Sequence, residues 1–265
     1  MGTYMRRMIA FPCTGETLVG TLDEAAGRTG LLIVSGGNEI RAGAHRGMAM
    51  LAQKLAEAGV PVLRYDRRGI GDSSGINAEF ESTADDIAAA VRALRGNGVA
   101  RVVGFGNCDA ASALALFHAD AGIDALVLSN PWTGGGGDDD LPQSAAIKAR
   151  YAQRLRDPKE WLRLLRGGVN IRNVFGGLLK VARSGSEDRG LVDRMATALK
   201  ASGLPTTILL AAHDNTAVAF ADAWRKCAYA TDARIVSLDS ASHSYAGAAD
   251  KDWLFDRLID ATLER

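Results

Sequence analysis

The chain has 265 residues, of which 47% are hydrophobic and 23% charged, and this composition excludes disordered and fibrous classes. Its length suits one large domain with an insertion better than two domains. The 31 basic residues balance the 31 acidic ones, which argues against a surface built as a whole for nucleic acid.

Two further classes are excluded by motif and hydropathy. Residues 1–7 are followed by no apolar stretch of signal-peptide length, and no apolar run approaches ~20 residues, so we expect a cytoplasmic protein without stable membrane insertion. The glycines of segment 66–75 do not follow the dinucleotide-binding pattern, and no Walker lysine is present. We therefore expect neither a nucleotide cofactor nor a metal.

Short apolar runs alternate with helical patterns along most of the chain, as is typical of a mostly parallel, doubly wound α/β sheet with crossover helices. The expected strands are 8–11, 17–22, 31–34, 62–65, 101–105, 125–129, 206–211 and 234–238, and the first two form a hairpin. The expected helices are 45–58, 83–95, an Ala-rich helix after 110, 217–228 and 251–263. This alternation of strand and helix patterns stops at 133–203, which predicts a helical cap inserted into a core made of 1–132 and 204–265.

The strongest local feature is the segment 106–110 (GNCDA), which lies between an expected strand and an expected helix. A strand-to-helix turn that exposes one side chain requires small residues two before and two after it, and Gly106 and Ala110 flank Cys108 in this way. The start of the following helix and a nearby imidazolium would both stabilise a Cys108 thiolate. The alternative is a buried structural cysteine. The strand-turn-helix context favours the nucleophile.

The other two cysteines are interpreted as structural. Cys13 falls in an expected turn and Cys227 late in a peripheral helix. The three cysteines are widely spaced and odd in number, so they indicate neither a disulfide framework nor a CxxC metal site.

An acid and a base follow the nucleophile in the chain order that this architecture requires. Asp214 follows the strand 206–211, and His243 follows the strand 234–238. His243 would take the thiol proton and deliver one to the leaving group, while Asp214 would fix its tautomer. The alternatives are an N-cap for Asp214 and an ordinary loop histidine for His243.

Further residues are candidates for the substrate site. The backbone N–H groups of Asp109 and Gly37 are the expected oxyanion donors. Asn38 in the same loop and Trp132 after the strand 125–129 are candidate substrate-binding residues. His45 and Arg46 are two more, although exposed charge at a helix start explains them equally well.

Several stretches resemble one particular family, the exosortase A system-associated hydrolases of the first type, a branch of the α/β-hydrolase superfamily. These stretches are LIVSGGNEIRAGAHR (32–46), PVLRYDRRGIGDSSG (61–75), GNCDAASA (106–113), LVLSNPW (126–132) and YAQRLRDPKEWLRLL (151–165), with DNT (214–216) and SHS (242–244). The resemblance covers nearly the whole chain. It implies the α/β-hydrolase fold and a hydrolase linked to exopolysaccharide and protein-sorting machinery, without a defined substrate.

Three functions are compatible with these residues. A thioesterase or esterase suits a thiolate, which is nucleophilic near neutral pH. An acyltransferase would pass the same acyl group from Cys108 to an alcohol or amine, and the sequence does not separate the two. A non-catalytic binding protein on the same fold is the third, and the complete set of nucleophile, base and acid argues against it.

The expected cap is strongly basic. Residues 145–183 contain ten basic and two acidic residues, interleaved with apolar ones such as Tyr151 and Trp161. Such a surface could dock an anionic acyl donor: an acyl carrier protein, a coenzyme A thioester or an anionic lipid. A solvated basic helix face over an apolar stripe explains the pattern equally well.

Overall fold

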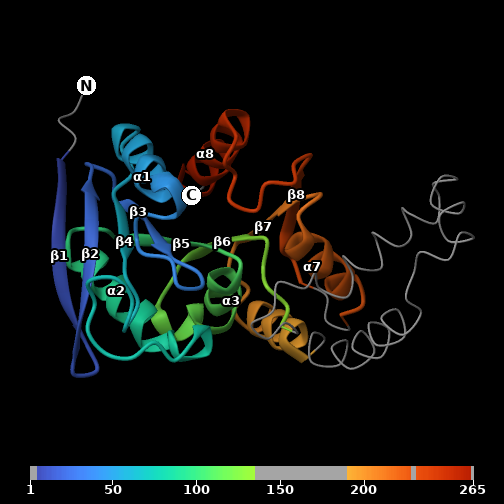
Figure 1. Ribbon diagram of the computed structural model, residues 1–265, viewed down its shortest axis with the longest axis horizontal. Coiled ribbons are helices and arrows are strands. Elements are labelled where there is room, and N and C mark those ends of the chain that lie inside the picture. Colours follow the sequence, from blue (N-terminus) through green and yellow to red (C-terminus); the bar gives the residue numbers. More distant parts are fainter. Residues whose placement is uncertain (1–4, 135–189, 228–230, 264–265) are drawn as a thin grey trace, which may run out of the picture.

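An eight-stranded sheet runs through the protein and carries helices on both faces (Figure 1). The computed structural model describes residues 5–134, 190–227 and 231–263. The strands are β1 (Met5–Cys13), β2 (Glu16–Glu24), β3 (Thr29–Val34), β4 (Val62–Tyr65), β5 (Arg101–Asn107), β6 (Ala125–Ser129), β7 (Thr206–Ala211) and β8 (Arg234–Leu238). They lie in the order β1-β2-β4-β3-β5-β6-β7-β8.

The sheet is antiparallel only at one edge. β1 pairs with β2 and β2 with β4 in antiparallel register, whereas every pair from β4 to β8 is parallel. This is the mostly parallel, doubly wound sheet expected from the sequence. All parallel strands end at the same edge of the sheet, where a ligand site of such a fold is normally found.

The helices divide between the two faces. The labelled helices are α1 (Gly47–Glu57), α2 (Ala84–Gly96), α3 (Asp109–Ala121), α7 (Asn215–Arg225) and α8 (Ala248–Leu263), with short 3₁₀ turns η1 (Ala44–Arg46) and η2 (Phe80–Ser82), and residues 190–202 are also helical. Figure 1 shows α1 and α8 above the sheet and α2, α3 and α7 below it.

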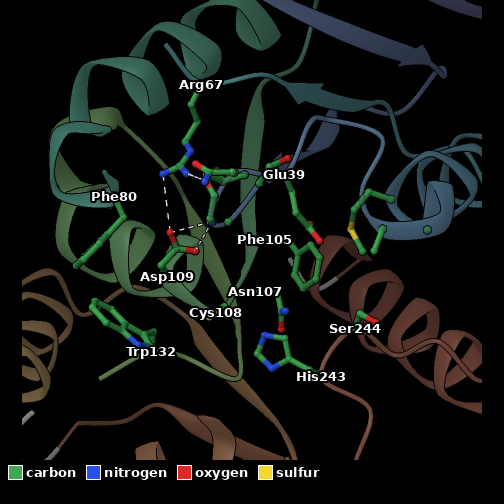
Figure 2. A pocket seen from close by; sticks show the side chains of 18 of the residues that line it. Glu39, Arg67, Phe80, Phe105, Asn107, Cys108, Asp109, Trp132, His243 and Ser244 are labelled. Carbon is green, nitrogen blue, oxygen red and sulfur yellow. Dashed lines mark hydrogen bonds and ion pairs between the residues drawn. The ribbon is translucent and has the colours of Figure 1, made fainter. Parts of the chain in front are cut away.

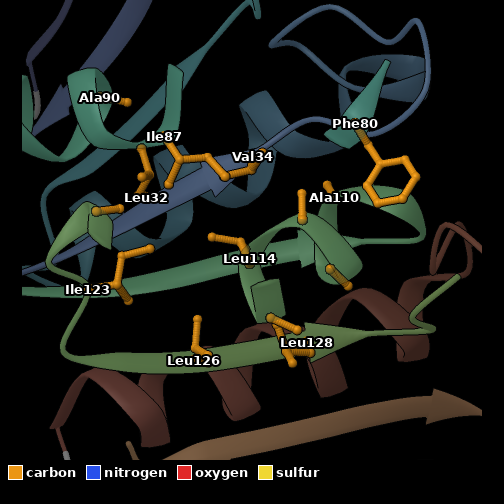
Figure 3. Packing of buried hydrophobic residues seen from close by; sticks show 14 of the residues in the cluster. Leu32, Val34, Phe80, Ile87, Ala90, Ala110, Leu114, Ile123, Leu126 and Leu128 are labelled. Atoms are coloured by element: carbon orange, nitrogen blue, oxygen red, sulfur yellow. The ribbon is translucent and has the colours of Figure 1, made fainter. Parts of the chain in front are cut away.

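Alternating side chains of the strands bury both faces of the sheet. In β3, Leu31 and Ile33 pack with α1 and α8, whereas Leu32 and Val34 pack with α2 and α3. Figure 3 shows Leu32 and Val34 beside Leu114 of α3 in the second cluster. Successive residues of a strand point to opposite faces, so a continuous apolar run such as 31–34 is what a strand covered on both sides requires.

The observed helix starts differ from the predicted ones by one to three residues, and the shift at α1 bears on the site. The sequence predicts a helix from His45, but α1 begins at Gly47 because His45 and Arg46 have φ angles of 50° and 61°, in the left-handed region. The two residues form part of η1 instead.

The boundaries of the expected cap, 133–203, remain a prediction, because 135–189 lie outside the described residues. Residues 190–202 are helical. Their side chains Leu191, Val192, Met195 and Leu199 belong to the same apolar cluster as α2 and α3. No helix in the described part of the chain has the length and hydropathy of a membrane span.

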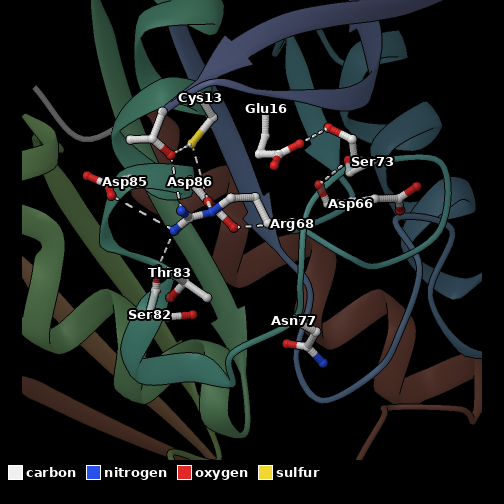
Figure 4. A network of polar contacts seen from close by, with 12 residues as sticks. Cys13, Glu16, Asp66, Arg68, Ser73, Asn77, Ser82, Thr83, Asp85 and Asp86 are labelled. Atoms are coloured by element: carbon white, nitrogen blue, oxygen red, sulfur yellow. Dashed lines mark hydrogen bonds and ion pairs between the residues drawn. The ribbon is translucent and has the colours of Figure 1, made fainter.

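A network of polar contacts fixes the loop that follows β4 (Figure 4). The Arg68 backbone N–H and Nε donate to the Asp86 carboxylate at 3.0 and 2.5 Å. Ser73 Oγ donates to the Asp66 carbonyl at 2.7 Å. Cys13 is buried in this network with its Sγ 3.3 Å from Asp86 Oδ1, and burial raises the pKa of its thiol. This packing supports the structural role that we expect for Cys13.

Candidate active site

Cys108 occupies a strained turn between β5 and α3. Its φ and ψ are 60° and −127°, a conformation that non-glycine residues rarely adopt. The turn is tight: a Cβ on Gly106 would lie 2.7 Å from the Ala110 carbonyl carbon, so only glycine fits there. The Cys108 N–H donates to the Ser129 carbonyl at 3.0 Å, which ties the turn to β6. Cys108 is also the N-cap residue of α3.

His243 and Asp214 form a pair next to Cys108. His243 Nδ1 lies 2.9 Å from Asp214 Oδ2. Asp214 is 8% exposed, and its Oδ2 also accepts the Ala217 N–H at 3.1 Å, so it caps α7 as well. The helix cap, which the sequence presents as an alternative to a role beside His243, and the hydrogen-bond partner of His243 are thus the same carboxylate.

Two neighbours, Asp214 and Cys108, raise the pKa of His243. Burial of the ring works against the charged form, but hydrogen bonds with Asp214 and Cys108, and their negative charge, outweigh it and raise the pKa of His243 to about 10. The imidazolium is therefore the dominant form near neutral pH. An imidazolium in this position can donate its proton to a leaving group.

A cavity of about 520 Å³ opens beside Cys108 (Figure 2). Gly37, Asn38, Asp109 and Trp132, all predicted from the sequence, line it together with Cys108 and His243. The Trp132 ring packs edge-to-face on Phe80, with ring centroids 5.3 Å apart. These two aromatic rings give one wall of the cavity an apolar surface.

The structure does not bring His45 and Arg46 to the cavity. Both are exposed on η1, while their neighbours Ala44, Gly47 and Met48 line it. The left-handed backbone at both residues turns the chain at this point. Exposed surface charge, the alternative interpretation of the sequence, is what the structure shows for them.

The predicted oxyanion donor Gly37 is engaged by another group. Its N–H donates to the Asp109 carboxylate, at 2.8 Å to Oδ1 and 2.9 Å to Oδ2. The loop approaches Asp109 so closely that a Cβ on Gly36 would lie 2.4 Å from Oδ1. The Asp109 N–H belongs to the first turn of α3, where N–H groups have no partner inside the helix. The Gly37 N–H can therefore reach another acceptor only if the Asp109 side chain moves away.

Two residues that the sequence analysis did not single out support the site. Asn130, fully buried, donates through Nδ2 to the His243 carbonyl at 3.2 Å and accepts the Ala211 N–H at 2.8 Å. It thereby connects the His243 loop to β7. Arg67, 3% exposed, donates to the Gly37 carbonyl. The sequence offers only weak signals for either: an Asn-Pro pair after β6 and a second arginine beside Arg68.

Comparisons with known proteins agree with this architecture. No curated protein matches the chain. Among solved structures, the esterase Pf2001 of Pyrococcus furiosus is 15% identical and covers 98% of this chain and 94% of its own, with a TM-score of 0.62. The α/β hydrolase GrgF of Penicillium sp. sh18 is 16% identical over 97% of this chain and 98% of its own, with a TM-score of 0.65. Est1E of Butyrivibrio proteoclasticus, solved with ferulic acid, is 17% identical over 97% and 100%, with a TM-score of 0.61.

At these identities the solved structures show that the fold is shared, and they say nothing of the substrate. The family model described as the alpha/beta hydrolase family matches residues 31–257, which include every strand from β4 to β8 and all residues of the candidate site. The chain therefore belongs to the α/β hydrolase family.

Proposed function

We propose that the protein hydrolyses an ester or a thioester through a covalent acyl intermediate on Cys108. The observation that carries the proposal is the position of Cys108: at the strained turn before α3, beside a histidine whose other ring nitrogen is held by Asp214. Nucleophile, base and orienting acid in this mutual arrangement are the parts that covalent acyl transfer requires.

In the first half-reaction the Cys108 thiolate attacks the acyl carbon, and the π electrons of the carbonyl move onto its oxygen. Backbone N–H groups at the turn stabilise that oxyanion. When the carbonyl reforms, the bond to the leaving alcohol or thiol breaks, and the imidazolium of His243 supplies the proton that the leaving group takes up. The products are an acyl-Cys108 thioester and a neutral His243.

In the second half-reaction His243 removes a proton from water as the oxygen attacks the thioester carbon. Collapse of this second oxyanion expels the Cys108 thiolate, releases the carboxylic acid and leaves His243 protonated, as at the start. Asp214 keeps Nδ1 of His243 protonated throughout, so that Nε2 faces the reacting atoms. An alcohol or amine in the place of water would make the same site an acyltransferase.

The narrower assignment is an exosortase A system-associated hydrolase of the first type, acting in exopolysaccharide-linked metabolism. It is supported by two segments: GNCDAASA runs from the end of β5 through the Cys108 turn into α3, and LVLSNPW covers most of β6 and the residues up to Trp132. The Trp132 N–H donates to the Cys108 carbonyl at 3.2 Å, so the two segments form one structural unit.

We also propose that the acyl donor is anionic, carried by an acyl carrier protein, by coenzyme A or by an anionic lipid. The basic segment 145–183 that suggests this lies outside the described residues. Raising the salt concentration from about 50 to 300 mM reduces the Debye length, the range of electrostatic attraction, by more than half. A coenzyme A thioester should then lose its rate advantage over a neutral short thioester, and an unchanged ratio of the two rates would remove the docking proposal.

Intact-mass measurement after mixing with an activated acyl thioester tests the acyl-enzyme directly. The adduct should form on the wild type and on Cys227→Ala, and should be lost in Cys108→Ala, because only Cys108 lies beside His243. Peptide mapping should locate it on Cys108. An adduct that persists in Cys108→Ala refutes the proposal, and added glycerol or an amine reports the acyltransferase alternative as an acylated acceptor.

A further inference from the structure

Asp109 and Arg67 lie close together beside Cys108, and two nitrogens of the Arg67 side chain have no acceptor there among the described residues (Figure 2). The Asp109 carboxylate holds the Gly37 N–H, while Arg67 donates to the Gly37 carbonyl. Arg67 Nη1 lies 3.9 Å from Asp109 Oδ2, which is too far for a hydrogen bond. Within the described part of the chain, Nη1 and Nε of Arg67 are buried without a hydrogen-bond partner.

A buried donor without an acceptor is energetically unfavourable, so an acceptor that comes within reach of Arg67 is stabilised. Asp109 Oδ2 needs to move by only about 1 Å to reach hydrogen-bond distance from Nη1. The backbone at Arg67 is held in place on both sides. Asp66 accepts a hydrogen bond from Ser73, and Arg68 donates hydrogen bonds to Asp86 (Figure 4). Arg67 can therefore offer its side-chain donors from a fixed position.

We propose that the Asp109 side chain closes the oxyanion site in the resting enzyme and that Arg67 receives its carboxylate when a substrate carbonyl oxygen takes the Gly37 N–H. This inference rests on the proposed acyl transfer at Cys108 and goes beyond it. Both residues act on Gly37 and through it on the substrate oxygen, so both are positioning residues.

The exchange is favourable because no buried charge is left unpaired. In the resting state the carboxylate has a charge-assisted hydrogen bond from Gly37, and in the open state it has one from Arg67. The Gly37 N–H likewise keeps an acceptor throughout: the Asp109 carboxylate in the resting state and the substrate carbonyl oxygen in the open state. Without Arg67, opening the site would leave the Asp109 carboxylate without a hydrogen-bond donor, although its side chain is only 17% exposed.

A double-mutant comparison tests this with two reagents. p-Nitrophenyl acetate acylates Cys108 and needs the oxyanion donors, whereas iodoacetamide alkylates a thiolate by displacement and does not. Asp109→Ala removes the closing group and should speed acylation by roughly 3- to 30-fold, with Asp109→Asn changing it in the same direction but less. Arg67→Met removes the receiver and should slow acylation by about tenfold or more.

The combination decides the role of Arg67. In Asp109→Ala no carboxylate has to be received, so adding Arg67→Met should leave acylation as fast as in Asp109→Ala alone. Alkylation of Cys108 by iodoacetamide measures the reactivity of the thiolate in each variant, so the ratio of the acylation rate to the alkylation rate isolates the effect on the oxyanion donors. If Arg67→Met slows acylation equally in both backgrounds, Arg67 only supports the Gly37 carbonyl and the inference is wrong.

Slower acylation in both Asp109→Ala and Asp109→Asn would also overturn it. Failure of the underlying function is a different result: wild-type enzyme that p-nitrophenyl acetate labels elsewhere than at Cys108, or not at all.

Discussion

The Asp214 carboxylate uses the same oxygen to bind His243 Nδ1, at 2.9 Å, and to cap helix α7 through the Ala217 N–H, at 3.1 Å. Helix capping holds the carboxylate in place before any substrate arrives. The start of a helix therefore fixes the orientation of the His243 ring.

Asp214→Asn should lower the acylation rate by about 10²- to 10⁴-fold while the protein stays folded, because Asn caps a helix as well as Asp but cannot hold the same tautomer of His243. Steady-state rates and thermal unfolding measure the two effects. Asp239→Asn is the matched control, since Asp239 pairs with His213 at 2.6 Å on the exposed surface. An equal loss of rate in both variants would remove the special role of Asp214.

The protonation of His243 should depend on its two partners. Its pKa of about 10 in the wild type should fall in Cys108→Ala, which removes a hydrogen-bond partner of the ring, and in Asp214→Asn, which removes the negative charge beside it. NMR titration of the imidazole signals measures it, and His243→Ala assigns the signal among the four histidines of the chain. A pKa that stays at about 10 in both variants would contradict the contacts described for this ring.

A raised pKa also has a consequence for stability. The stabilisation that His243 gives the fold is fully present below about pH 6.5 and is lost as the pH rises towards about 10. The unfolding free energy of the wild type should fall relative to that of His243→Ala over this window, as urea denaturation at pH 7 and pH 9.5 measures.

His118 should have the opposite pH dependence. Burial lowers the pKa of this fully buried ring in α3, so the neutral form is favoured in the folded state. Stability should therefore fall as the pH drops below the unfolded pKa of about 6.5. His118→Leu should lose less unfolding free energy between pH 7.5 and 5.5 than the wild type does. Exposed His213→Ala serves as the control and should follow the wild type.

Gly106→Ala should destabilise the protein by about 1–3 kcal/mol and slow acylation, because the added Cβ would collide with the backbone of Ala110. Gly96→Ala, at the end of α2, adds a Cβ that meets nothing within 4 Å, and should change stability by no more than about 1 kcal/mol. Urea denaturation compares the two. Similar small effects at both glycines would mean that the turn relaxes around the added methyl group.

Local sequence patterns by themselves determined the framework of this protein. The strands 62–65, 125–129, 206–211 and 234–238 coincide with their observed bounds, because short apolar runs between turn residues have few other structures open to them. The small residues on either side of Cys108 predicted its tight turn for the same local, steric reason. Asp214 and His243 could be placed because strands that run parallel bring their carboxyl ends to one edge.

Only the tertiary structure decided which groups meet at that edge. The contacts between Asp109 and Gly37, and between Asn130 and the His243 loop, join residues 72 and 113 positions apart. The exposure of His45 and Arg46 could not be predicted either. It follows from their left-handed backbone angles, and neither residue type favours such angles enough to predict them from the sequence. Side-chain contacts across a sheet depend on strand order and loop geometry, and a periodic pattern carries information on neither.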